Sequence, residues 1–161
     1  MTMLPRSLLA LLLAAGLTGC TRPAATTPAN APVAKHEHHP PHGGTPVVLG
    51  EELYHLELVR DAATGRLSAY VLDGEMEDFV RIAAPSLEIT ATVDGQPRTL
   101  TLTAVANPAT GETVGSTSFF EAQADWLKAT KEFDAILTKI EVRGTAFTAV
   151  AFNFPKGNDQ D

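Results

Sequence analysis

The feature that most constrains the fold is a period-two alternation of apolar and polar residues, which recurs in short runs from about residue 44 to residue 154. In the run at residues 54–58, Tyr54, Leu56 and Leu58 alternate with His55 and Glu57. Successive side chains of a strand point to opposite faces, so we expect the three apolar residues in a core and His55 and Glu57 on the outward face. Such runs are typical of an antiparallel sheet with one buried face.

Gly, Pro and Asp separate the runs, and Asp94-Gly95 suits the positive φ angles of a tight hairpin turn. Trp126, Thr130 and Phe133 share one helical face, so residues 125–133 are expected to form a short helix or helical crossover. We predict an all-β fold, an immunoglobulin-like antiparallel sandwich of about seven to nine strands with one short helix. The periodicity leaves the strand order open. The expected strands are residues 46–49, 54–58, 66–73, 87–93, 98–105, 118–124, 136–143 and 146–154.

The N-terminus has the pattern of a signal peptide, with Arg6 followed by an apolar run at residues 7–18. That run is shorter than the roughly 20 residues that a membrane-spanning helix needs, so we expect it to be removed. The segment Leu17-Thr18-Gly19-Cys20 resembles the lipobox of bacterial lipoproteins. The resemblance implies that residues 1–19 are cleaved and that Cys20 carries covalently attached lipid, which anchors the protein to a membrane. The alternative is an ordinary secretory signal that ends near a cysteine.

The residue after the cysteine is Thr21, whereas in lipoproteins of the Gram-negative kind an Asp there resembles an inner-membrane retention signal. We therefore expect an outer-membrane lipoprotein that faces the periplasm, or a cell-surface lipoprotein where there is no outer membrane. Since Cys20 is the only cysteine, its lipidation leaves none for a disulfide, a thiolate nucleophile or a Cys-based zinc site. The formal net charge of −7 argues against nucleic acid as a partner.

The chain divides by composition into a tether, a domain and a short tail. Residues 20–42 comprise the lipidated cysteine, a Pro/Ala/Thr-rich stretch and a His-rich segment. The Pro/Ala/Thr-rich stretch has no aromatic residue and no period, so we expect a disordered tether. Residues 43–156 are expected to form the sandwich domain, which we expect to be monomeric, and residues 157–161 a polar tail.

Histidines are the candidate functional residues, because four of the five lie within residues 36–42. Neutral imidazole is a good ligand for Zn(II) and Cu(II), and a run of several can wrap a metal without a preformed cage. Gly43 and Gly44 allow a sharp bend that could bring His42 near His55 and Glu57, which would give a site of two histidines and one carboxylate. The predicted metal ligands are His36, His38, His39 and His42, joined in one version of the hypothesis by His55 and Glu57. The alternative is a solvated polar spacer.

A second resemblance extends from the His-rich segment into the first strands. The residues His42-Gly43-Gly44, the apolar strand 46–49 and the run 54–58 resemble the small N-terminal domain of some periplasmic adaptor subunits of heavy-metal efflux systems. Short lipoproteins that carry this domain alone show the same pattern, and the similarity covers about residues 42–75. It implies a β-rich, metal-linked periplasmic module whose partner is a metal-efflux or metal-handling protein. The adaptor's coiled-coil hairpin and lipoyl-like domain have no counterpart in this sequence.

Enzymatic chemistry finds little support in the sequence. Every histidine precedes residue 56, residues 115–118 lack the spacing of a nucleophile elbow, and no Gly-rich phosphate-binding loop is present. We therefore expect a non-enzymatic protein. Two functions stay open: an envelope lipoprotein that binds Zn or Cu for buffering, delivery or efflux, and an interaction module that binds a protein or polymer.

Overall fold

The computed structural model describes residues 39–159, which belong to one compact unit, Lys35–Asp161. The predicted signal peptide, Cys20, the tether, His36 and His38 lie outside the described residues. Within residues 39–159, no helix is both long enough and apolar enough to cross a membrane.

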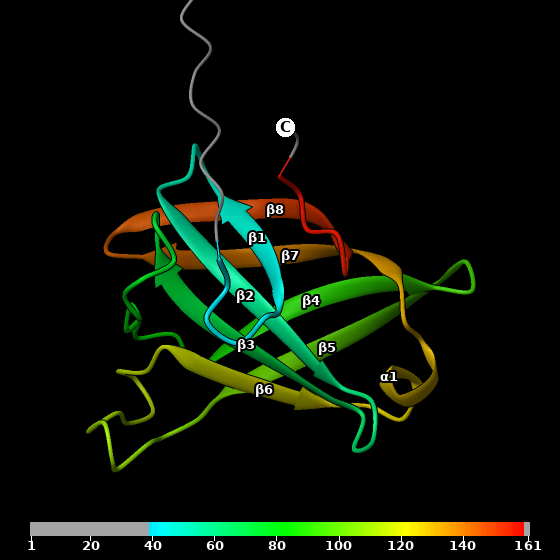
Figure 1. Cartoon of the computed structure of the whole chain (residues 1–161), viewed down its shortest axis with the longest axis horizontal. Coiled ribbons are helices and arrows are strands. Elements are labelled where there is room, and N and C mark those ends of the chain that lie inside the picture. The colour runs from blue at the N-terminus through cyan, green and yellow to red at the C-terminus, as the bar shows by residue number, and fades with distance from the viewer. Residues whose placement is uncertain (1–38, 160–161) are drawn as a thin grey trace, which may run out of the picture. The chain divides into compact units, whose positions relative to one another are not determined.

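Eight antiparallel strands and one short helix, α1 (Trp126–Ala129), make up the described part of the chain (Figure 1). They confirm the predicted all-β fold and its range of strand number. One continuous sheet contains all eight strands in the order β1-β2-β3-β6-β5-β4-β7-β8. The strands are β1 (Thr45–Leu49), β2 (Tyr54–Asp61), β3 (Arg66–Asp73), β4 (Ser86–Val93), β5 (Gln96–Ala104), β6 (Phe119–Gln123), β7 (Phe133–Val142) and β8 (Thr145–Phe154).

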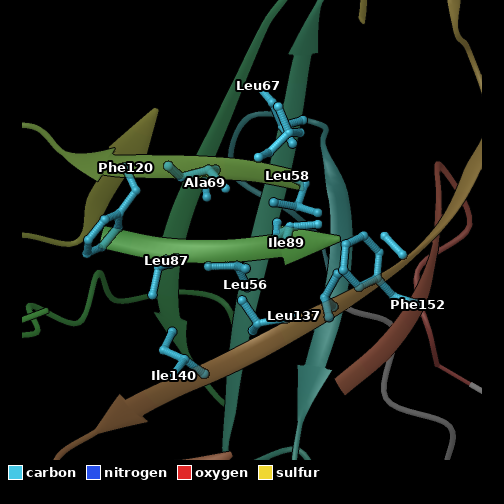
Figure 2. Packing of buried hydrophobic residues seen from close by; sticks show 14 of the residues in the cluster. Leu56, Leu58, Leu67, Ala69, Leu87, Ile89, Phe120, Leu137, Ile140 and Phe152 are labelled. Atoms are coloured by element: carbon cyan, nitrogen blue, oxygen red, sulfur yellow. The ribbon is translucent and has the colours of Figure 1, made fainter. Parts of the chain in front are cut away.

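The sheet curls so that side chains from its two halves meet in a single core (Figure 2). Leu56 and Leu58 of β2 are fully buried there, as the alternation predicts. Ile89 of β4 and Leu137 of β7 are also fully buried and lie near them in the same view. Burying such side chains contributes about 1.5–3 kcal/mol each, so the alternation on the inward face supplies much of the stability.

The sheet is nearly closed, and the C-terminal segment fastens its seam. The first and last strands, β1 and β8, run side by side (Figure 1). The side-chain amide of Asn158 accepts a hydrogen bond from the Val48 N–H at 2.7 Å and donates one to the Val48 carbonyl at 3.2 Å. Gly157 in turn forms two backbone hydrogen bonds with Asn153 of β8. Residues 157–158, expected in a polar tail, therefore connect both edges of the sheet.

The helix is shorter than predicted, because the chain turns extended at Thr130, with φ −83° and ψ 114°. Phe133 begins β7 and stacks on Phe154 of β8 at 5.1 Å, and the Trp126 ring meets Phe133 edge-on at 5.3 Å. Phe133 and Phe154 thus meet across the pair of β7 and β8, although Trp126 and Phe133 also fit a helical period. The predicted hairpin turn at residues 94–95 is present, with positive φ at both residues.

Candidate functional site

The centre of the candidate site is the carboxylate of Glu57, which β2 carries on the face opposite the core. Its Oε1 accepts hydrogen bonds from the backbone N–H groups of His42 at 2.8 Å and Gly44 at 2.9 Å. Its Oε2 lies 2.8 Å from Nδ1 of the His42 ring. Three contacts therefore converge on one carboxylate that is fully buried although it lies on the outward face of the sheet.

Two glycines let the chain close over this carboxylate. Gly43 has φ +66° and donates its N–H to the Pro40 carbonyl, which makes the turn that carries His42. At Gly44 a Cβ atom would lie 2.6 Å from the Leu58 carbonyl oxygen and 2.8 Å from Cγ of Glu57. No side chain fits at residue 44, so the bend that the sequence suggested depends on the absence of a side chain there.

The His42 ring is held on its face as well as at its edge. It stacks on Tyr70 of β3 with ring centres 3.9 Å apart and planes 16° apart, and Phe79 lies 5.8 Å away. Tyr70 stacks in turn on Phe119 of β6 at 4.7 Å. The register places Glu57, Tyr70 and Phe119 opposite one another on three adjacent strands. Neighbouring strands thus provide both the hydrogen bond and the stacking surface that orient the imidazole.

Burial, and then the negative charges of Glu121 and Glu57, raise the pKa of the Tyr70 phenol. The ring beneath His42 therefore stays neutral around pH 7 and is not a phenolate ligand. Tyr70, Phe79 and Phe119 were not among the residues that the sequence singled out. Like Ser68, Tyr70 alternates with the buried apolar residues of its strand, and this position indicates an aromatic side chain on the outward face of the sheet. Phe79 lies outside any periodic run, so no such pattern marks it.

The orientation of the imidazole selects the nitrogen that can meet a ligand. A carboxylate only accepts hydrogen bonds, so Nδ1 carries the hydrogen in the contact with Glu57. In the neutral imidazole the lone pair is then on Nε2. The His42 side chain is 38% exposed. A carboxylate behind one ring nitrogen of a partly exposed imidazole is the arrangement found around histidines that bind metal ions in proteins.

The remaining predicted ligands lie in different settings. His39 is exposed, whereas His55 is fully buried, with Nδ1 3.2 Å from the Asp73 carbonyl oxygen. His55 and Glu57 point away from the core, as expected, but both side chains are fully buried and neither reaches solvent. Among residues 39–159, no three His, Cys, Asp or Glu side chains are grouped closely enough to hold a metal ion. The structure therefore brings together His42 and Glu57 of the predicted set.

No family model, curated protein or solved structure matches this chain. The resemblances to the lipobox and to the efflux-adaptor domain stay predictions from the sequence.

Proposed function

We propose that this protein is a cell-envelope lipoprotein that binds Zn(II) or Cu(II) through its His-rich segment, in metal buffering, delivery or efflux. The observation that supports this function best is the pair formed by His42 and Glu57. A buried carboxylate on Nδ1 fixes the tautomer and orientation of the ring and raises the basicity of Nε2. His42 would then be the fixed ligand, and His36, His38 and His39 would complete the coordination.

In this proposal Glu57 positions a ligand and is not itself one. Its Oε1 already accepts two backbone hydrogen bonds, and its Oε2 is engaged by the His42 ring. Moving the carboxylate onto a metal would leave these donors without an acceptor in a buried place, which costs about 1–3 kcal/mol for each group. Imidazole nitrogens are good ligands for both Zn(II) and Cu(II). Because His42 contacts Glu57, a bound ion would connect the other histidines of the segment to β2.

The test is calorimetric titration of Zn(II) and Cu(II) into the chain from residue 21 onward, which retains the whole compact unit. Replacement of His36, His38, His39 and His42 by Ala should remove most of the binding. Protons compete for the same nitrogens, so affinity should fall as the pH drops below about 6.5. The control is a chain in which residues 21–38 are scrambled except for His36 and His38. It keeps the histidines but changes the order of the other residues.

Equal affinity in the wild-type chain and the quadruple variant would end the metal hypothesis. The histidines would then be a spacer, and the alternative of an envelope interaction module would take its place. Covalent lipid at Cys20 is tested separately, because the binding measurement uses a chain without it.

A further inference from the structure

The pairing of β4 with β7 stops well before either strand ends. The two strands pair from Thr92 with Asp134 to Ile89 with Leu137, and then they separate. β7 continues along β8 as far as Val142. A groove of about 720 Å³ lies in the opening, between the start of β4, the end of β7 and residues 81–84. This volume is within the range of about 300–1,000 Å³ typical of ligand sites.

An irregularity in the hairpin of β7 and β8 coincides with the opening. In β7 the buried residues change phase, because Thr138 and Lys139 are consecutive exposed residues between buried Leu137 and Ile140. The ladder skips the pair of Thr138 with Ala149 at the same place. Ala149 has φ 51°, a conformation that costs an alanine roughly 1–2 kcal/mol. No residue is inserted, because the register of β7 with β8 is the same on both sides of this pair. The burial phase changes in both strands at this point, which is also where the pairing of β7 with β4 ends.

The opening leaves a free strand edge beside an apolar floor. Ile82 and Ile140 line the groove and are almost fully buried. Within residues 39–159, the edge of β7 beyond Leu137 has no backbone hydrogen-bond partner on the side of β4. An unpaired edge of this kind is a template for another extended chain. Backbone strain retained in the middle of a strand is also more common at functional sites than elsewhere.

Charge on the rim indicates what kind of chain would bind. Three cationic side chains and two carboxylates line the groove, in a chain with formal net charge −7. Arg81 lies 4.0 Å from the Glu112 carboxylate, and the Lys139 ammonium lies 3.8 Å from Glu141. Glu88 accepts a hydrogen bond from the Thr138 hydroxyl. Arg143, in the turn after β7, has no ion pair with any residue of the described part of the chain. An uncompensated guanidinium favours a carboxylate on the occupant.

We propose that this groove binds an extended acidic peptide segment of a partner protein, which adds a strand to the free edge of β7. Main-chain hydrogen bonds to residues 138–142 would supply affinity, and alternate side chains would rest on Ile82 and Ile140. A carboxylate of the peptide would meet Arg143. The interaction surface is separate in composition from the residues around His42, so its existence does not depend on metal binding.

The probe is a hexapeptide of alternating valine and glutamate, titrated into the isotope-labelled chain from residue 21 onward and followed by amide NMR shifts. We expect saturable shifts concentrated in residues 81–88 and 138–144. A version with N-methylated backbone amides cannot donate hydrogen bonds and should bind at least tenfold more weakly. Arg143→Asn, which suits the positive φ of 48° at this residue, should weaken binding about fivefold.

Arg98→Asn is the matched control, because Arg98 is an exposed arginine on β5 that does not line the groove, and its loss should leave affinity unchanged. Absence of shifts in the groove at millimolar peptide would overturn the proposal. Equal binding of the N-methylated peptide would also overturn it, because the site would then bind an anionic amphiphile without strand addition; titration with decanoate would identify that case.

Discussion

Replacement of Glu57 by Gln tests how the His42 ring is held, since the two side chains have nearly the same shape. The Gln amide can place its oxygen toward the N–H groups of His42 and Gly44, which leaves its NH₂ group facing Nδ1 of the ring. Nδ1 would then have to accept a hydrogen bond, so the ring hydrogen would move to Nε2. Glu57→Gln therefore removes the lone pair that we assign to the metal without removing the histidine.

The size of the effect follows from the three contacts. Hydrogen bonds to a charged group contribute about 1.5–3 kcal/mol each and neutral ones about 0.5–1.5 kcal/mol. Converting the two backbone hydrogen bonds to neutral ones should lower the free energy of unfolding by about 2–3 kcal/mol, and the contact with the partly exposed ring should add little. Loss of a carboxylate behind a metal-binding histidine typically reduces metal affinity about 10–100-fold, and we expect that range.

Urea unfolding measures the first quantity and calorimetric titration of Zn(II) the second, both on the chain from residue 21 onward. Glu141→Gln is the control, because Glu141 is an exposed carboxylate that forms a surface pair with Lys139. Its unfolding free energy should change by less than about 0.5 kcal/mol. If His42→Ala lowers metal affinity but Glu57→Gln does not, the orienting role of Glu57 is refuted and His42 acts independently of it.

Three further results are expected. Cys20→Ser should abolish acylation and membrane association in cells, and a variant that still sediments with membranes after carbonate washing would contradict the lipid anchor. Asn158→Ala should lower the free energy of unfolding, measured in urea, by about 1–3 kcal/mol, because both hydrogen bonds to Val48 are lost. An unchanged urea midpoint would show that β1 and β8 stay together without these hydrogen bonds. Burial opposes ionisation of Glu112, but hydrogen bonds from Ser118 and Thr110 and the charge of Arg81 hold its pKa below the ordinary value of 4.5. Its stabilising contribution is therefore present above about pH 4.5 and is lost as the pH falls through the lower folded-state pKa, so Glu112→Gln should flatten urea midpoints measured between pH 3 and 6.

The strands could be predicted closely because each one is a local pattern. Residues 66–73 match β3 at both ends, and the turn at residues 94–95 follows from the conformational preference of an Asp-Gly pair. The order of the strands is not local. β6 lies between β3 and β5, and nothing in the periodicity of any one strand specifies its neighbours.

The candidate site was predictable only in part, for a related reason. The bend at Gly43 and Gly44 suggested that His42 approaches Glu57 and His55; it does approach Glu57, but within residues 39–159 no three-ligand group that includes His55 forms. The burial of Glu57 was not predictable from the alternation of β2, because the cover comes from another segment, the turn at residues 40–44. The stacking of Tyr70 on His42 likewise depends on the register between β2 and β3.

The proposed metal site around His42 and the proposed peptide groove approach each other along one short segment, residues 79–82. Phe79 lies against the His42 ring at 5.8 Å, and Ile82 lines the groove between β4 and β7. The backbone of this segment is fixed on both sides, since Val80 donates to the Val71 carbonyl and Ile82 exchanges two hydrogen bonds with Thr117. Because these hydrogen bonds hold the segment in one arrangement, we expect it to transmit no change from one site to the other.

We therefore predict that metal and peptide bind independently. Saturating Zn(II) should change the affinity of the valine-glutamate peptide by less than twofold, and by thermodynamic reciprocity the peptide should change metal affinity equally little. Amide NMR titrations with and without the metal measure the first quantity, and Zn(II) calorimetry with and without the peptide measures the second. A coupling of fivefold or more would correspond to about 1 kcal/mol and would show that residues 79–82 move when either ligand binds. In that case the amide hydrogens of Val80 and Ile82 should exchange with solvent faster in the free protein than in the doubly liganded one. Hydrogen-exchange rates at those two amides would measure the difference.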